Sequence, residues 1–255
     1  MTNPRDHARH PQRVGPDAAT DSAGLPWARR ALTPSGFEND SGASDPAVLA
    51  ALVADDEEAM MAMLAAARFL VAVVAHADEM VHDLAGLAHD TAVDMALVTL
   101  TAPDGRRALP AFTGVAELAA WDQAARPVPV AAATLAQAAI AESCQVVVVN
   151  LGLASARELR PSQVWALAMQ RTWLPPDRDP FVHAALGAAV ASEPEVTAYG
   201  TYAAQPAGTV GVELTLVAGL DHAAIESLVT RVGERLATDG EFRARIDGLA
   251  FRLAG

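Results

Sequence analysis

A predicted β-hairpin between residues 95 and 113 constrains the fold of this chain more than any other stretch. Two apolar runs flank Pro103-Asp104-Gly105, and these three residue types favour a tight turn in that order. The pattern predicts strands near 94–101 and 106–112. The hairpin contains no nucleophile, metal cage or phosphate-binding loop, so it predicts a structural element and not a reactive centre.

Two further expectations concern where these strands lie in a sheet. The first strand is apolar on both faces, with Ala96, Val98 and Leu100 on one side and Met95 and Leu97 on the other; this predicts a central strand. In the second strand, Pro110 has no amide proton to donate. It is therefore expected at a sheet edge or at a bulge.

Periodicity and capping residues predict the other elements. An Asp followed by Pro at 45–46 predicts a helix start. Helices are expected near 45–52, 56–67, 115–125, 132–142, 161–171, 180–191 and 221–236, and extended segments near 69–74, 126–130, 145–150, 196–203, 209–217 and 249–253. The fold class predicted is α+β, with an N-terminal mixed sheet flanked by helices and a smaller C-terminal α-β-β-α-β domain.

Composition divides the chain into four parts. Residues 1–44 are rich in Pro, Gly, Asp, Ser and Arg, and too few large apolar residues are present to offset the entropy of ordering, which predicts a disordered tail. A first α+β domain is expected over 45–173. The run PPDRD predicts a linker at 174–179, and the pattern then restarts as a small α+β domain over 180–255.

The charge distribution bears on possible partners. The formal net charge is −13, and the chain has no lysine, so its 18 basic residues are all arginine. Residues 47–105 hold ten acids and one arginine, which is a net charge of −9. The acidic residues of this segment begin at Asp55-Asp56-Glu57-Glu58. Nucleic-acid binding needs a basic face, so no nucleic-acid partner is expected. The acidic segment either steers a basic protein partner or is a solvated face.

Cysteine content and hydropathy predict a cytoplasmic protein. Cys144 is the single cysteine, so no intrachain disulfide can form. The N-terminus has no apolar core of a signal peptide. The apolar stretch 59–75 is shorter than a membrane span and has Arg68 at its middle. No membrane association is therefore expected.

The first predicted domain resembles the SseB N-terminal domain, particularly its actinobacterial members. The resemblance rests on Asp94–Leu100, Asp104–Thr113, Leu118 with Trp121, and Ala125–Val130 in this order, and it covers about residues 48–170. The second domain is similar to the smaller SseB-type C-terminal domain that often follows. The resemblance implies a bacterial protein of unknown biochemical role, with no catalytic or ligand-binding residues to carry over. At Asn150-Leu151-Gly152 the chain departs from a common pattern of the family.

One cluster of His and acidic residues suggests an alternative function, that of a metal-dependent hydrolase. Its members are His and acidic side chains within one short stretch, at spacings that would place several on one helix face: His76, Asp78, Glu79, His82, Asp83, His89 and Asp90. Imidazole and carboxylate ligands suit a divalent ion. However, all of them lie in one segment that Gly86 weakens as a helix, so a solvated acidic connector is the competing interpretation.

Other candidates also have structural interpretations. Cys144 lies among acidic and apolar residues, which favours a structural cysteine over a nucleophile. Arg106 and Arg107 follow the turn and would either recognise an anion or serve solubility at a strand edge. Trp121, Trp165 and Trp173 are expected in the core or at the domain interface, and Trp173 is also a candidate for an interdomain anchor or an exposed contact.

The sequence thus predicts a non-catalytic protein-interaction or regulatory module. Its expected contact surface is the acidic segment 55–94 or the groove between the two domains. No catalytic, cofactor-binding or metal-ligating residue is assigned, and no cofactor is expected. The alternative is a metal-dependent hydrolase or a small-molecule binder that uses the His76–Asp90 region or the interdomain cleft. The oligomeric state is left open.

Overall fold

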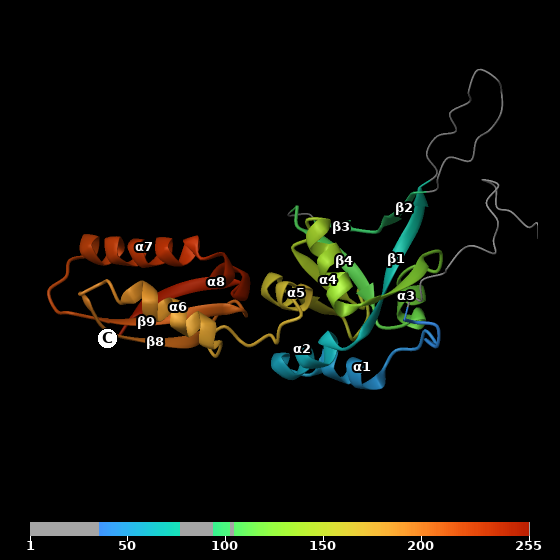
Figure 1. Cartoon of the computed structure of the whole chain (residues 1–255), viewed down its shortest axis with the longest axis horizontal. Helices are drawn as coiled ribbons and strands as arrows, with labels where there is room; N and C mark the ends of the chain where they lie inside the picture. The colour runs from blue at the N-terminus through green and yellow to red at the C-terminus, as the bar shows by residue number, and fades with distance from the viewer. Residues whose placement is uncertain (1–35, 77–93, 103–104, 255) are drawn as a thin grey trace, which may run out of the picture. The chain divides into compact units, whose positions relative to one another are not determined.

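The computed structural model describes residues 36–76, 94–102 and 105–254 (Figure 1). Residues 41–255 form one compact unit, and 36–40 belong to a separate one. The compact unit holds a larger mixed sheet and a smaller three-stranded sheet, each with its own helices. The predicted α+β class is therefore confirmed, whereas the predicted division into domains at 174–179 stays a prediction.

The larger sheet comes from the first part of the chain. Its strands are β1 (Arg68–His76), β2 (Asp94–Leu97), β3 (Leu100–Thr101), β4 (Arg107–Phe112), β5 (Arg126–Ala131), β6 (Val146–Val149) and β7 (Arg157–Leu159). Their order is β2-β1-β4-β6-β7, with β3 paired to β4 and β5 paired to β1. Only β4 and β6 run parallel; the other pairs are antiparallel.

Five helices accompany this sheet, and side-chain caps fix where the first two begin. The helices are α1 (Pro46–Val53), α2 (Glu57–Ala65), α3 (Val115–Trp121), α4 (Ala132–Ala141) and α5 (Pro161–Ala168). The Asp45 carboxylate accepts a hydrogen bond from the Ala47 amide, and the Asp56 carboxylate accepts one from the Ala59 amide. Each cap satisfies a donor that the first helical turn leaves without a partner.

Strand β1 is buried on both faces because alternate side chains enter different cores. Phe69 and Val71 pack into the cluster that also contains residues of α1, α2, α4 and α5. Leu70 and Ala72 point to the other face, where they pack with Phe112 and Leu118. A continuous apolar run is what this double burial requires.

Two expectations about the hairpin are wrong. Strand 94–101 is divided: β2 pairs with β1 and lies at the sheet edge, and only the two-residue β3 pairs with β4. Pro110 lies in the interior strand β4 and is buried. On one side of β4 the neighbour changes from β3, beside Ala108, to β1, beside Ala111. Pro110 is tolerated in an interior strand because it lies at this change of partner, where an amide donor is not needed.

The remaining residues build the smaller sheet in the predicted order, with one additional helix. The elements are α6 (Pro180–Val190), β8 (Val196–Ala204), β9 (Thr209–Leu216), α7 (His222–Thr238), α8 (Gly240–Arg245) and β10 (Gly248–Leu253). The sheet order is β10-β9-β8, with β8 antiparallel and β10 parallel to β9. The short helix α8 was not predicted.

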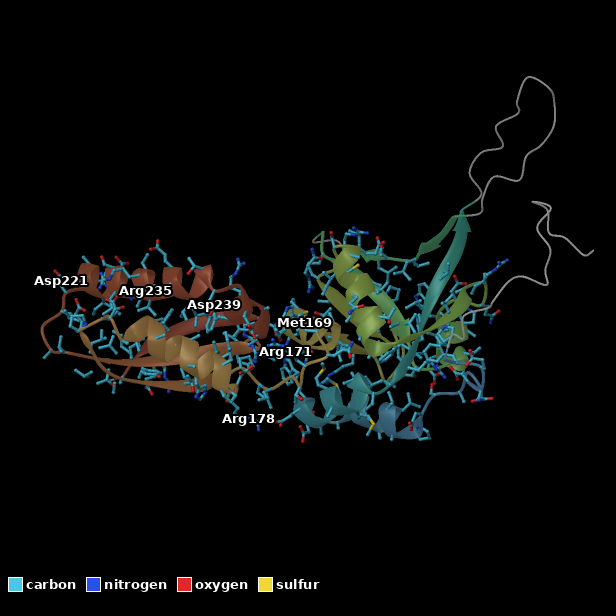
Figure 2. All side chains as sticks on the ribbon, viewed as in Figure 1. Met169, Arg171, Arg178, Asp221, Arg235 and Asp239 are labelled. Carbon is cyan, nitrogen blue, oxygen red and sulfur yellow. The ribbon has the colours of Figure 1, made fainter. Side chains whose placement is uncertain are left out.

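The helices of this second part cover one face of the small sheet. Val210, Val212 and Leu214 of β9 form its centre, and residues of α6 and α7 pack on them. Asp221 and Asp239 lie at the two ends of α7 (Figure 2), and the Asp221 carboxylate accepts from the Ala224 amide. Leu228, Val232 and Leu236 of the predicted apolar stripe of α7 thus pack on the sheet.

Candidate interaction surface

The predicted metal cluster lies almost wholly outside the described residues. Of its members, only the backbone of His76 is described, where it ends β1 opposite Asp94. Among the described residues, no group of three or more His, Cys, Asp or Glu side chains lies close enough to hold a metal ion. The hydrolase alternative therefore stays a prediction about 76–90.

The described part of the acidic segment is engaged within the molecule. Asp56 caps α2, Glu57 pairs with Arg160, and Glu58 lies 3.1 Å from a guanidinium nitrogen of Arg178. Asp55 alone among the four has no interaction of this kind and is exposed. This run is therefore mainly a structural feature and offers little free charge to a basic partner. Residues 77–93 lie outside the described residues.

The other charged or reactive candidates have structural surroundings. Cys144 is buried, and burial raises the pKa of its thiol, against a weaker opposing effect of Arg107. Arg107 donates to the Thr99 hydroxyl at 3.1 Å and lies 3.8 Å from Glu142. Arg106 lies 3.5 Å from Glu158. The favoured structural interpretation of Cys144 fits this burial, because a nucleophilic cysteine needs a lowered pKa.

The tryptophans lie at packing contacts. Trp121 stacks on Phe112 with ring centroids 5.3 Å apart, and Trp173 is buried. Arg245 and Arg171 both lie over the Trp165 ring, with guanidinium carbons 5.7 and 5.5 Å from its centroid. These rings therefore serve the core and its ion pairs.

A network of buried and half-buried groups is centred on Arg160, at the N-terminus of α5. Arg160 donates to both carboxylate oxygens of Glu57 and, through Nε, to Asp247 at 3.0 Å. Asp247 also accepts from the amide and hydroxyl of Ser162, and the Trp173 indole donates to that hydroxyl. The bonds from Arg160 lower the pKa of the Glu57 carboxyl below its usual value. The charged groups of this network are paired with one another, which is typical of a structural role.

Two cavities beside this network lack a set of convergent free polar groups. One, of about 560 Å³, is lined mainly by small and apolar residues of α2, α4 and α5 together with Arg171. Arg171, however, is paired with Glu241 (Figure 2 labels its position). The other, of about 320 Å³, is lined by Ile140, Cys144, Trp165 and neighbouring residues, and Arg243 is its one charged side chain. Neither cavity supplies an acid, base or ligand set with which to nominate a reaction.

The feature that stands out is the open edge of the small sheet at β10. In the described part of the chain, β10 pairs only with β9. The Ala254 amide donates to the Leu214 carbonyl of β9, so by strand alternation Arg252 and Ala250 also direct their backbone groups to β9. Leu249, Phe251 and Leu253 therefore direct their amides and carbonyls away from the sheet.

An apolar groove runs beside this edge. It has a volume of about 500 Å³ and lies between α7 and β10; its lining residues are Ile225, Glu226, Val229, Thr230, Phe251, Arg252 and Leu253. Leu253 is 46% exposed. Arg252 does not place an unpaired charge in the groove, because its guanidinium lies 3.8 Å from the Tyr202 ring centroid and 3.2 Å from Glu213. We call β10 with this groove the β10 edge.

Most of the other strand edges in the described chain carry features that discourage pairing, and β10 has none of these features. The edge strand β5 contains Pro127 and Pro129, which lack amide donors. Strands β2, β3 and β7 have four residues or fewer. Strand β8 has a register shift at its start, near Val196, but Ala198–Ala204 pair regularly with β9, so β8 is only partly protected. Prolines, short strands and irregular registers are the usual protection of exposed edges.

Sequence reasoning identified the alternation of β10 but not its position at an open edge. Of the three predicted alternating residues, Leu249 and Phe251 pack against the core of the small sheet, whereas Leu253 is exposed. The parallel pairing with β9 depends on the crossover through α7 and α8, which a local pattern does not encode. The sequence predicts Ile225 and Val229 in the core stripe of α7; both are only half-buried and line the groove, and Val229 also packs against the core.

Comparison with known proteins supports the resemblance for the N-terminal part. The family model described as SseB protein N-terminal domain matches residues 46–166, which contain α1 to α5 and β1 to β7 except the last residues of α5. Among curated proteins and solved structures, none matches the chain. The SseB-type C-terminal domain and the actinobacterial origin stay predictions.

None of the described helices combines the length and the apolar character that crossing a bilayer requires.

Proposed function

We propose that this chain is a non-catalytic protein-interaction module of the SseB family, and that it binds its partner through the β10 edge. The observation that carries the proposal is the outward row of backbone groups at Leu249, Phe251 and Leu253, which lies beside an apolar groove. An extended segment added to such an edge gains main-chain hydrogen bonds, and alternate side chains give specificity by filling adjoining pockets.

The charge and chemistry of the described residues favour this function over the alternatives. Apart from Cys144, the described ionisable groups with shifted pKa values lie in ion pairs, for example Glu193 with Arg231 and Glu241 with Arg245, so they stabilise the fold. Perturbed groups that serve a reaction would instead converge on a cavity. A small-molecule binder would use the cavity beside Arg171, whose charge is engaged by Glu241. A cytoplasmic location stays a prediction.

The proposal is tested by affinity capture with the full-length chain and two matched variants. Leu253→Lys places a charge in the groove, and Val53→Lys places the same charge on an equally apolar and more exposed site in α1. We expect Leu253→Lys to lose a partner that wild type and Val53→Lys retain, with all three showing the same circular dichroism. A partner bound equally by Leu253→Lys would contradict the proposed surface.

A further inference from the structure

We propose that the partner bound at the β10 edge is a second copy of this chain. Two β10 strands would pair antiparallel about a two-fold axis at Phe251, which joins two three-stranded sheets into one of six strands. This inference rests on the proposed function, because it names the partner of the same surface.

The backbone geometry fits this pairing. Leu249, Phe251 and Leu253 all direct their amides and carbonyls outward, as derived above. With Phe251 opposite its own symmetry mate, Leu249 of one copy faces Leu253 of the other, and every pair of this set is a hydrogen-bonded pair. Each such pair exchanges two N–H···O bonds, so the outward backbone groups of the strand find partners.

The side chains are complementary in the same register. On the helix-covered face, Phe251 meets Phe251, and Leu249 meets Leu253 of the other copy; the apolar groove beside them is then covered. On the opposite face, Arg252 meets Ala250 and not another charge. Its guanidinium is already neutralised by Glu213 at 3.2 Å, so the seam holds no like-charge contact.

A second copy is favoured over an unrelated partner by self-complementarity. A two-fold interface brings the same patch of both copies together, so a strand that matches itself in hydrogen bonding, apolar pattern and charge is suited to it. β10 has this property in the register just described. The edge strand β5 does not have it, because Pro127 and Pro129 remove amide donors.

The first test is sedimentation velocity of the full-length chain over a range of concentrations. We expect wild type and Val53→Lys to form dimers as concentration rises. Leu253→Lys should weaken the dimer by about tenfold or more, because a two-fold axis introduces the charge twice. Dimers that Leu253→Lys leaves unchanged would overturn the inference.

The second test fixes the register with engineered cysteines. In the proposed pairing, Ala250 of one copy lies opposite Arg252 of the other in a non-hydrogen-bonded pair, where β-carbons are about 4.5–5.5 Å apart and a disulfide can form. Under mild oxidation, mixed Ala250→Cys and Arg252→Cys chains should cross-link to each other. Neither variant should cross-link alone. Cross-linking of Ala250→Cys with itself would overturn the register centred on Phe251.

These experiments separate this inference from the proposed function. A chain that stays monomeric at every concentration, but whose captured partner is lost on Leu253→Lys, overturns the second-copy inference and leaves the interaction module intact. A chain that stays monomeric and whose captured partners are unaffected by Leu253→Lys overturns both. Cross-linking of the mixed cysteine variants supports both, even where the lysine variant fails to fold.

Discussion

Arg160 donates two parallel hydrogen bonds to Glu57, from Nη1 to Oε1 at 2.7 Å and from Nη2 to Oε2 at 2.8 Å. The two residues are 103 positions apart in sequence. The same guanidinium donates through Nε to Asp247, 87 positions further along. One side chain thus joins α2, the start of α5 and the segment before β10, the strand of the proposed interaction surface.

Replacing Arg160 should destabilise the fold markedly. In Arg160→Gln, the Glu57 and Asp247 carboxylates lose their shared cation. Removing one partner of a fully buried ion pair costs about 3–5 kcal/mol. Because these side chains are 10–25% exposed, we expect the free energy of unfolding, measured with urea, to fall by about 1–3 kcal/mol. The matched control Arg106→Gln breaks an exposed pair and should change stability by less than about 0.5 kcal/mol. Equal effects of the two changes would contradict the structural role of Arg160.

The Glu193 carboxylate should make stability depend on pH. It is buried between Arg231 and Arg235 of α7, and the hydrogen bond from Arg231 lowers its pKa from the usual 4.5. A carboxyl with a lowered folded-state pKa stabilises the fold above its unfolded pKa, and this contribution is lost as pH falls through the folded value.

Glu193→Gln should therefore be less stable than wild type at pH 7, with a difference that shrinks as pH falls below about 4.5. Urea midpoints measured from pH 7 to pH 3 would check this. The control Glu234→Gln removes an exposed carboxyl of α7, the helix that holds Arg231 and Arg235, and should leave the pH dependence of stability nearly as in wild type. A Glu193→Gln difference that stays constant over this range would contradict the account.

Asn150 combines an unusual backbone with buried hydrogen bonds, and the two contributions can be separated. Its φ is 52°, and its side chain accepts from the Thr113 amide at 2.9 Å and donates to Ser155. Asn150→Gly keeps the left-handed backbone accessible but leaves the Thr113 amide without a partner, at a cost of about 1–3 kcal/mol. Asn150→Ala should cost about 1 kcal/mol more because of backbone strain. An alanine variant as stable as the glycine variant would contradict this.

Cys144 should react slowly while the protein is folded. Because burial raises the pKa of its thiol, the thiolate fraction at pH 7.5 is small and access is limited. Labelling with a disulfide reagent should be at least about tenfold slower in native buffer than in denaturant. Rapid labelling of the native chain would indicate an exposed, activated thiol and would reopen a nucleophilic role.

The sequence predicted most elements because their signals are local. Asp45, Asp221 and the alternation in 209–217 involve neighbours within one turn or one strand, and the structure has helices and a strand there. The missed helix α8 has one buried apolar residue, Phe242, so it shows no periodicity to detect. The split of strand 94–101 depends on β1, a distant partner that the local pattern cannot specify.

The candidate site was predictable only in part, for the same reason. Alternation in β10 was visible, but its open edge follows from sheet order. The acidic run was visible too, yet its engagement by Arg160 and Arg178, more than 100 residues away, was not. Net charge counts residues without their partners, and long-range ion pairs decide whether that charge is free.

Amide hydrogen exchange of the full-length chain tests the use of the β10 edge most directly. In dilute, monomeric protein, the amides of Leu249, Phe251 and Leu253 have no strand partner among the described residues and should exchange quickly, whereas Val212 in the interior strand is a protected reference. On raising the concentration, the account predicts that exchange at these three amides slows by about tenfold or more, with no change at Val212. Exchange at these amides that stays fast at every concentration, and with any captured partner bound, would contradict the claim that this edge is where the protein binds.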